Sequence, residues 1–392
     1  MFKCGTSLLV PSVQELAKQP NIEVQEKYLQ PNQESIVVSN TTSLQQVPII
    51  DLSKLLSEDA NELEKLDQAC KEWGFFQLIN HGVNPSLMEN VKIGVKEFLT
   101  IPVEEKKKFW QTPNDIEGFG QLFVASEDQK LEWADLFFIA TLPSYARNPR
   151  LFPNIPQPFR DNLETYCLEL KKVCITIIKN MEKALKVEPN EMLESFDDIN
   201  QSMSDIEGLQ IRKDGQWISI KPLTNAFVIN IGDILEIMTN GIYRSIEHRA
   251  TVNSKNERIS IAAFHRPPMS KIIGPTPSLV TSEMPALFKT LPVEDYYTVT
   301  KDASGSKKES KKGAEPWRCE ENRLRYERNK EELILTESEE EELGSDLEEF
   351  LWTYEDNLAD YPAEVQKLAD EALSLLKEKL KSIESEASKS KP

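Results

Sequence analysis

Three residues between positions 243 and 264 have the types and spacing to bind a ligand: His248, Arg258 and Ser260. An imidazole nitrogen is a common ligand for metal ions. A guanidinium offers a planar fork that matches a carboxylate, and a nearby hydroxyl can donate a hydrogen bond to the same oxygens. This combination indicates a site for a metal ion together with a dicarboxylate that chelates it.

The geometry behind this interpretation is a predicted β-hairpin. Two β-rich runs flank the polar loop 253–257, and a hairpin closed there places His248 opposite Ala262. Because side chains alternate across a strand, His248, Arg258 and Ser260 then share one face of the sheet, among small residues. Arg258 lies four residues along the strand from the level of His248, roughly 13 Å, which an arginine side chain and a five-carbon diacid can span.

Simpler interpretations of these residues are also open. An isolated histidine is in most proteins a packed or solvated group, and Arg258 could pair with Glu257 or Glu236. The chain has two other histidines. His81 follows a predicted aromatic strand, where we expect a structural role, and His265 is expected to line a pocket or the surface rather than to bind a metal.

The wider sequence resembles the plant 2-oxoglutarate/Fe(II)-dependent dioxygenases. His248 followed ten residues later by Arg-x-Ser at Arg258 and Ser260 is similar to the family's pattern. Four further stretches are similar to the family, in the same order: VPIIDLSKLL (47–56), KEWGFFQLINHGV (71–83), EGFGQLFVASEDQKLEWADLFF (117–138) and the strand-rich run 207–241. The resemblance covers residues 1–297 with one internal gap, and it is strongest to the branch of alkaloid O-demethylases and dioxygenase-type norcoclaurine synthases.

This resemblance implies a fold, two cofactors and a reaction. The implied fold is α+β: a double-stranded β-helix, or jelly-roll, with a helical N-terminal half. The implied metal is Fe(II), held by a His-x-Asp pair and by a distal histidine that corresponds to His248. The implied co-substrate is 2-oxoglutarate, held by Arg258 and Ser260, with ascorbate as reductant. The implied reaction is hydroxylation or O-demethylation of an aromatic, alkaloid-like plant metabolite.

The His-x-Asp pair is missing from this chain. None of the three histidines is followed two residues later by aspartate, and the sequence passes from Met203 to Ser204 where the family carries that segment. Nearby acids could substitute, although such clusters are usually only solvated: Asp197, Asp198, Asp205 and Glu207. We therefore expect an incomplete jelly-roll with unpaired strand edges and impaired iron binding. The alternative is a catalytically inactive, truncated or mis-joined family member that binds a partner through its tail.

Three regions are expected along the chain. Residues 1–200 form a helical and mixed N-terminal region with a long helix over 163–185, and residues 204–297 form the partial jelly-roll. The remaining residues, 298–392, resemble nothing in the family and are expected to form a linker and an acidic, partly helical tail. They hold 16 Lys and Arg against 25 Asp and Glu, and begin with a Lys/Ser/Gly stretch that is typical of a flexible linker. This tail could bind an unknown protein.

Composition narrows the location and the partners. A net charge of −19 argues against nucleic-acid binding, which needs a basic surface. No apolar run approaches the ~18 residues of a membrane helix. The five cysteines are scattered, which favours free thiols in a reducing compartment and hence a cytoplasmic protein. They are Cys4, Cys70, Cys167, Cys174 and Cys319.

Aromatic residues before the gap are candidates for a flat substrate pocket. Phe119, Phe123 and Trp133 lie in the stretch 117–138 and could shape such a pocket. Buried aromatic side chains also dominate protein cores, so core packing is expected for at least one of the three.

Overall fold

We examined a computed structural model of the chain. It describes residues 10–18, 26–28, 46–112, 115–121, 124, 131, 133–196, 200–204, 209–250 and 259–295. The chain divides into two compact units, Met1–Arg323 and Leu324–Pro392, and all described residues belong to the first.

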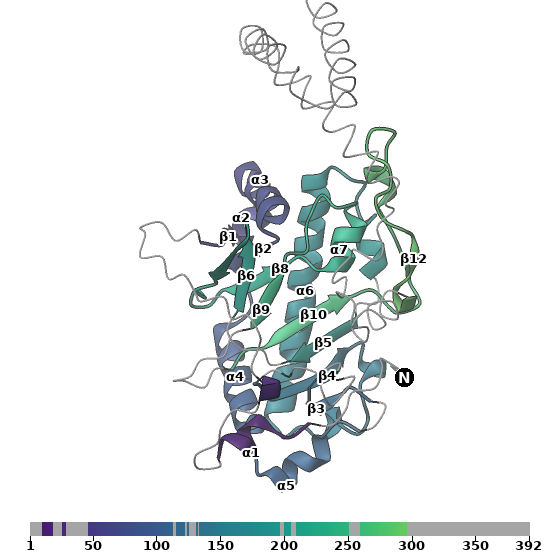
Figure 1. The fold of residues 1–392 in the computed structure, drawn as a ribbon. Coiled ribbons are helices and arrows are strands. Elements are labelled where there is room, and N and C mark those ends of the chain that lie inside the picture. Colours follow the sequence, from purple (N-terminus) through teal and green to yellow (C-terminus); the bar gives the residue numbers. More distant parts are fainter. Residues whose placement is uncertain are drawn as a thin grey trace, which may run out of the picture. The chain divides into compact units, whose positions relative to one another are not determined.

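The N-terminal half of the first unit is mainly helical (Figure 1). Its longer elements are α1 (Val13–Ala17), β1 (Ile49–Asp51), α2 (Leu52–Leu56), α3 (Ala60–Gln68), β2 (Phe75–Ile79), α4 (Pro85–Leu99), α5 (Val103–Lys106), β3 (Gly118–Gly120), β4 (Leu136–Leu142) and α6 (Phe159–Leu185). A π-helical turn, Ala69–Trp73, links α3 to β2. Short 3₁₀ turns occur at Glu26–Tyr28, Lys107–Phe109, Ser144–Ala146 and Phe152–Asn154.

The second half is rich in strands. It contains β5 (Asn200–Ser204), β6 (Leu209–Lys213), β7 (Gln216–Ser219), β8 (Phe227–Asn230), α7 (Asp233–Met238), β9 (His248–Ala250), β10 (Ala262–Arg266), β11 (Ile272–Ile273) and β12 (Leu291–Pro292). Two 3₁₀ turns, Leu193–Phe196 and Pro277–Leu279, complete the described part.

The described strands form four sheets, with the orders β1-β2-β8, β10-β5-β4-β3, β7-β6-β9 and β11-β12. Strand β2 pairs parallel to β1 and antiparallel to β8, so the N-terminal half contributes directly to the strand system of the second half. Within the described residues, β8, β9 and β10 each end a sheet. The expectation that a missing segment leaves strands with unpaired edges stays a prediction, because the residues on either side of these strands lie partly outside the described ranges.

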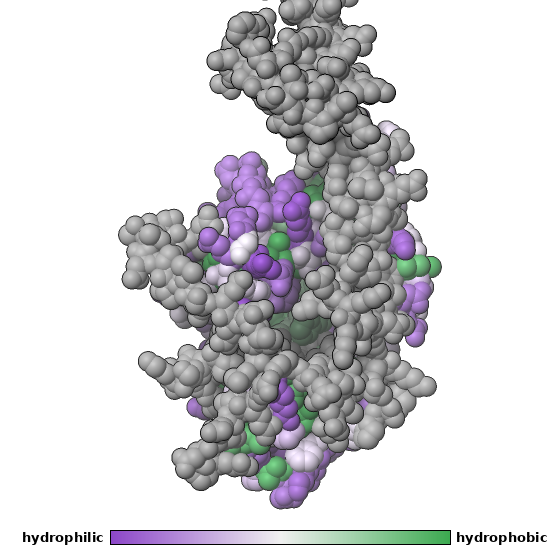
Figure 2. Space-filling model, viewed as in Figure 1, coloured by the Kyte–Doolittle hydropathy of each residue, from purple (hydrophilic) through white to green (hydrophobic). Residues whose placement is uncertain are grey.

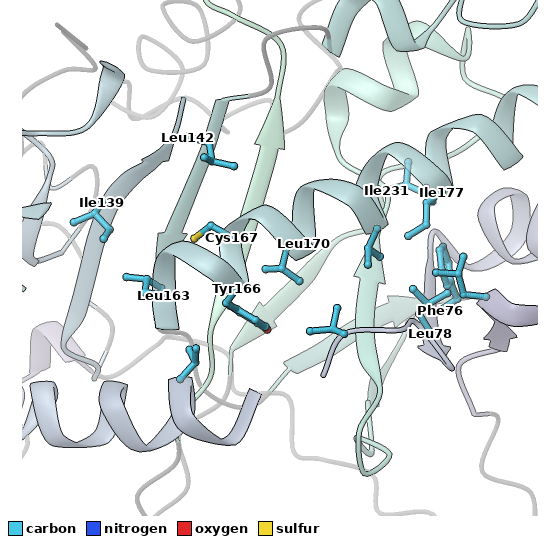
Figure 3. Packing of buried hydrophobic residues seen from close by; sticks show 14 of the residues in the cluster. Phe76, Leu78, Ile139, Leu142, Leu163, Tyr166, Cys167, Leu170, Ile177 and Ile231 are labelled. Carbon is cyan, nitrogen blue, oxygen red and sulfur yellow. The ribbon is translucent and has the colours of Figure 1, made fainter. Parts of the chain in front are cut away.

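Helix α6 supplies the largest share of the core (Figure 3). Its buried residues recur every three or four positions, which aligns them on one face of the helix. They include Leu163, Cys167, Leu170, Val173 and Ile177. The same cluster contains Ile139 and Leu142 of β4, and Phe76, Leu78 and Ile231 from the region of β2 and β8. One helix thus packs against residues of two separate sheets.

Helix α4 packs closely against α6 because of a glycine. A Cβ atom added to Gly94 would lie 2.3 Å from the ring of Phe159, so only a hydrogen at this position lets the two helices approach. The start of α4 is set by Asn84, whose side chain accepts a hydrogen bond from the backbone N–H of Ser86, and by Pro85 at the first helical position.

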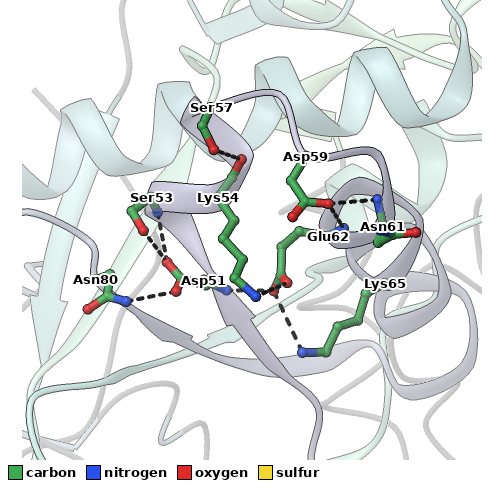
Figure 4. A network of polar contacts seen from close by, with 9 residues as sticks. All are labelled: Asp51, Ser53, Lys54, Ser57, Asp59, Asn61, Glu62, Lys65 and Asn80. Carbon is green, nitrogen blue, oxygen red and sulfur yellow. Dashed lines mark hydrogen bonds and ion pairs between the residues drawn. The ribbon is translucent and has the colours of Figure 1, made fainter.

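A polar network fixes the start of the first sheet (Figure 4). The carboxylate of Asp51 caps α2 by accepting a hydrogen bond from the backbone N–H of Ser53, and it also accepts one from the side chain of Asn80. The buried carboxylate of Glu62 accepts a hydrogen bond from the backbone N–H of Asp51 at 2.7 Å. These contacts join β1, α2, α3 and the end of β2.

Most of the predicted elements are present. The strand after residue 74, the helix from Pro85 and the strands of the run 207–241 are confirmed, and the long helix begins at Phe159, four residues earlier than expected. Among the described residues, no helix has both the length and the apolar character that membrane crossing requires.

We predict that two neighbouring leucines of α2 differ sharply in their effect on stability. Leu55 is 2% exposed and Leu56 is 65% exposed. Leu55→Ala should lower the free energy of unfolding by about 2–4 kcal/mol, because it leaves a cavity in the core. Leu56→Ala, the matched control, should change it by less than about 0.5 kcal/mol. Urea unfolding monitored by circular dichroism measures both values, and equal effects would contradict this packing.

Candidate functional site

His248 lies at the start of β9, opposite Ile211 of β6. Its ring meets Phe75 edge to face, with ring centroids 5.4 Å apart. Its Nδ1 atom is 2.9 Å from the carbonyl oxygen of Ile246. Because a carbonyl only accepts, the proton of the neutral ring sits on Nδ1, and the Nε2 lone pair points away from that contact. The imidazole is exposed, and in the neutral ring Nε2 is the nitrogen that this contact leaves available to a metal ion.

The segment before His248 is anchored to the N-terminal half. The fully buried Tyr243 donates its hydroxyl hydrogen bond to Asp67 at 2.9 Å, and the buried carboxylate of Glu236 accepts one from the backbone N–H of Ser245. Gly74, with φ of +59°, passes so close to Arg244 that a Cβ atom there would lie 2.4 Å from its carbonyl oxygen. The position of β9 therefore depends on contacts made some 170 residues earlier in the chain, by the residues around α3.

The predicted hairpin between β9 and β10 is wrong. His248 pairs with Ile211, whereas Ala262 pairs with Ser204 of β5, so the two strands belong to different sheets. The shared sheet face predicted for His248, Ser260 and Ala262 is wrong for the same reason, because β9 and β10 belong to different sheets. A cross-strand distance between His248 and Arg258 consequently has no basis in this structure.

Arg258 and Ser260 were predicted to bind a carboxylate together, and of the two the structure describes Ser260. It is half-buried and precedes β10 by two residues. Its neighbours Ile259 and Ile261 pack against the main core, so Ser260 faces away from that core together with Ala262. Arg258 lies outside the described residues, and so do Phe123 and the four acids near the junction, Asp197, Asp198, Asp205 and Glu207.

One face of the sheet containing β10 is covered by α6, and the opposite face carries aromatic and small residues. Phe264 of β10 and Ala140 of β4 both pair with Ser202 of β5, so their side chains point to the same face of the sheet. Ala262 lies two residues before Phe264, and Phe138 two residues before Ala140, so these two side chains point to that face as well. Phe264 is 47% exposed. Figure 2 shows hydrophobic surface set back near the middle of the molecule, where Figure 1 places β10 and α6.

Phe138 and Phe264 were missed as candidate pocket residues, although a signal for Phe264 exists. It continues the alternation that already included Ser260 and Ala262. Phe119, which was predicted as a possible pocket residue, is instead buried and stacks on Phe98 with ring centroids 5.3 Å apart. Trp133 meets the ring of Tyr28 edge to face. The expectation of core packing for at least one of these aromatic residues is confirmed.

The two other histidines are held in structural contacts. The Nδ1 atom of His81 accepts a hydrogen bond from the backbone N–H of Val83, and its Nε2–H donates one to the carbonyl of Asn225 at 3.0 Å. The ring also stacks on Phe227 at 4.0 Å. Burial lowers the pKa of His81, so the ring stays neutral. The structural role expected for His81 is confirmed.

His265 belongs to β10 and pairs with Gln201 of β5. Two hydrogen bonds orient the side-chain amide of Gln201. The amide oxygen accepts one from the hydroxyl of Thr141 at 2.7 Å, and the amide nitrogen donates one to the backbone carbonyl of Cys167. That nitrogen therefore donates to Nε2 of His265 at 2.9 Å. Burial, with a smaller contribution from Lys171, lowers the pKa of His265 to about 4. His265 thus holds β10 against β5 as a neutral acceptor.

The donor set does not fit an iron ion held by three protein ligands. Such a site needs two histidines and a carboxylate on one centre. Across the ranges that the structure describes, no group of three His, Cys, Asp or Glu side chains could hold a metal ion. His81 and His265 are committed elsewhere, so among the histidines His248 is the single candidate ligand.

Comparison with known families gives two matches in chain order. The family described as "non-haem dioxygenase in morphine synthesis N-terminal" matches residues 47–155, and the "2OG-Fe(II) oxygenase superfamily" matches residues 173–267. The chain is 47% identical to Protein SRG1 of Arabidopsis thaliana, with 74% of this chain and 92% of that protein covered. It is 45% identical to codeine O-demethylase of Papaver somniferum, with 75% and 93% covered.

A solved structure agrees with these matches. JOX2, crystallised in complex with 2OG, Fe and JA, superposes with a TM-score of 0.66 at 29% identity, covering 74% of this chain and 93% of that one. The dioxygenase for auxin oxidation in rice, at 18% identity and a TM-score of 0.57, shares the fold. The jelly-roll core expected from the sequence is confirmed.

The alignments also measure what this chain lacks. The alignment with Protein SRG1 runs over 329 positions, whereas 74% of 392 residues is only about 290. The difference means that about 40 positions of that relative have no counterpart here. This shortfall is long enough for two or three strands with their connections.

We predict that His265 makes stability depend on pH in the acid range. Its pKa falls from an ordinary 6.5 to about 4 on folding, so the folded state excludes a proton that the unfolded chain binds. The stability is fully present above pH 6.5 and is lost as pH falls towards 4. His265→Gln, which keeps an acceptor but does not titrate, should reduce this loss by about 1–3 kcal/mol. Urea unfolding at several pH values measures it, and an unchanged pH dependence would contradict the assignment.

Proposed function

Because the chain belongs to the 2-oxoglutarate/Fe(II) oxygenase superfamily, we propose that it keeps the family's co-substrate and substrate surfaces without the complete iron site. On this proposal the chain does not by itself catalyse the hydroxylation or O-demethylation that its resemblance to the family implies. The observation that carries the proposal is the absence of any His-x-Asp sequence in a chain with only three histidines.

The chemistry of the ligand set supports this proposal. Fe(II) in a facial triad gains its affinity and its geometry from three ligands held together, with the other positions open for reactants. His248 offers one exposed imidazole, and a single exposed imidazole holds Fe(II) weakly. Asp205 or Glu207, close to the junction in the sequence, would have to replace a missing histidine–carboxylate pair. Two carboxylates beside one imidazole would be a different ligand set.

The co-substrate half of the site is proposed at Arg258 and Ser260. Ser260 faces the same side as Ala262 at the start of β10. Arg258 precedes Ser260 by two residues in the sequence, a spacing that in an extended chain would put both side chains on one side. An arginine and a hydroxyl on one side match a terminal carboxylate of 2-oxoglutarate. In this chain they would orient the diacid and neutralise its charge.

The substrate class is proposed to be a flat, aromatic, alkaloid-like metabolite. Phe138 and Phe264 lie on the face of the sheet opposite α6, on the two strands that flank β5, and the small residues Ala140 and Ala262 lie beside them on the same strands. Two aromatic rings with small residues beside them suit a planar ring system. The 45% identity to codeine O-demethylase supports the same class.

The proposal also assigns regions and a location. We propose that residues 1–200 form the N-terminal region and that residues 204–297 form the partial jelly-roll. Residues 298–392 are proposed to be a tail that could bind a protein. A cytoplasmic location is supported by the free thiols of the described cysteines, Cys70, Cys167 and Cys174.

An active enzyme is the second candidate function. The identity of more than 40% to two O-demethylases of Papaver somniferum favours it, because that similarity extends over most of their length. In this case acids outside the described residues would complete the iron site, and the chain would hydroxylate or O-demethylate its substrate. The two candidates differ in whether succinate is produced.

We predict that the purified chain forms no succinate from 2-oxoglutarate above a protein-free control when Fe(II) and ascorbate are supplied. Inserting the His-x-Asp segment of codeine O-demethylase at the junction between Met203 and Ser204 should raise succinate formation by at least about 100-fold, because it would supply two iron ligands. The matched control is the same chimera with His248→Ala, which should be inactive. Iron-dependent succinate formation by the unmodified chain would establish the second candidate instead.

We also predict that 2-oxoglutarate binding depends on Arg258. In calorimetric titrations of the unmodified chain with 2-oxoglutarate, Arg258→Gln should weaken binding about 10-fold or more, since a charge-assisted pair is lost, and Ser260→Ala less. Arg212→Gln is the control, because Arg212 is exposed, forms an ion pair with Glu247, and lies in β6, which is not in the sheet that contains β10. Equal affinity of Arg258→Gln and the unmodified chain would remove Arg258 from the site.

A further inference from the structure

Two short segments near the N-terminus, residues 10–18 and 26–28, contact the stretch of chain that leads into β4. The first segment is held by Asp135, whose carboxylate accepts a hydrogen bond from the hydroxyl of Ser12 at 2.6 Å. The same carboxylate accepts two more from backbone N–H groups, those of Val13 at 2.7 Å and Gln14 at 3.0 Å. Hydrogen bonds to an ionised acceptor are stronger than bonds between neutral groups. Asp135 therefore binds this segment through both of its oxygens.

The second segment contacts the same stretch through its backbone and through an aromatic ring. The carbonyl of Lys27 accepts a hydrogen bond from the backbone N–H of Leu131 at 2.8 Å. The ring of Tyr28 meets Trp133 edge to face, with ring centroids 5.1 Å apart. A small apolar cluster contains Val13 of the first segment and Tyr28 of the second, together with Leu131. The two segments thus share one contact surface.

Tyr28 opposes the contact that Asp135 favours. Its side chain is only 6% exposed, and among the residues that the structure describes its hydroxyl has no hydrogen-bond partner. A hydroxyl buried without a partner loses the hydrogen bonds that it makes with water. Opening of the contact would return the hydroxyl to water. The closed contact therefore combines a stabilising carboxylate with a destabilising hydroxyl, as expected for an element that can change between two states.

We propose that residues 10–18 and 26–28 form a strap that opens and closes as one unit, with Asp135 as its latch and the hydroxyl of Tyr28 favouring the open state. The apolar cluster under the strap shares none of its buried residues with the main core, so opening leaves the core around α6 intact. Because β4 begins directly after Asp135, closure also fixes the start of the strand that carries Phe138. This last link to a substrate rests on the proposed function, whereas the strap does not.

Hydrogen exchange of the full chain, measured by mass spectrometry with residue-level fragmentation, tests whether the strap moves as one unit. The N–H of Gln14 is bonded to Asp135, whereas the N–H of Leu131 is bonded to Lys27. Asp135→Asn puts an amide nitrogen, which cannot accept a hydrogen bond, in place of one carboxylate oxygen. Exchange should then become at least about 10-fold faster at Leu131 as well as at Gln14. Acceleration at Gln14 alone would overturn the proposal.

Tyr28→Phe should have the opposite effect. It keeps the ring that meets Trp133 and removes the unpartnered hydroxyl, so the closed state becomes more stable. Exchange at Gln14, an amide bonded to Asp135, should become about 5- to 10-fold slower. Unchanged or faster exchange at Gln14 in this variant would overturn the role of Tyr28.

Controls separate the strap from general unfolding. The N–H of Leu170, in the middle of α6, should exchange at the same rate in every variant. Asp161→Asn, which changes an exposed carboxylate at the start of α6, should leave Gln14 and Leu131 unaffected.

A second latch variant applies if Asp135→Asn fails to fold. Ser12→Ala removes one hydrogen bond from the strap side, far in sequence from Leu131. It should accelerate exchange at Leu131 about 3-fold, and an unchanged rate there would overturn the single strap. None of these measurements uses iron, 2-oxoglutarate or a substrate, so their failure is distinct from a failure of the proposed function.

Discussion

The burial of one face of α6 against two separate sheets is the interaction on which the rest of the structure depends. Side chains from Leu163 to Ile177 reach both β4 and the region of β2 and β8 (Figure 3). Each large side chain that is fully buried contributes about 1.5–3 kcal/mol, so one face of this helix contributes more than a typical net stability. The two sheets keep their positions through this helix, although within the described residues no strand joins them.

The histidines show how local contacts decide which groups are available for chemistry. His81 and His265 each have a ring nitrogen occupied by a partner that fixes its proton, a carbonyl in one case and an amide in the other. His248 is also fixed by a carbonyl, but on the nitrogen that leaves Nε2 exposed. The three residues look alike in the sequence, and only their partners separate a ligand candidate from two structural groups.

Much of the fold could be predicted from the sequence, because helices and short strands depend on local periodicity. The apolar spacing after Leu163 predicted α6, and the short β-rich stretches in the run 207–241 predicted β6 to β8. The four extra residues at the start of α6 were missed because Phe159 belongs to the helix through its packing on Gly94, a contact between distant segments. The hairpin failed for a related reason: alternation determines the face of a residue, whereas the choice of neighbouring strand depends on the whole sheet.

The ladder of a sheet and the packing of a helix respond differently to the loss of a segment. A ladder needs each strand in its place, whereas α6 contacts the strands through side chains distributed over 27 residues. A chain of this fold that lost strands elsewhere would keep its core around α6, because the buried side chains of this helix have their partners in β4 and in the region of β2 and β8.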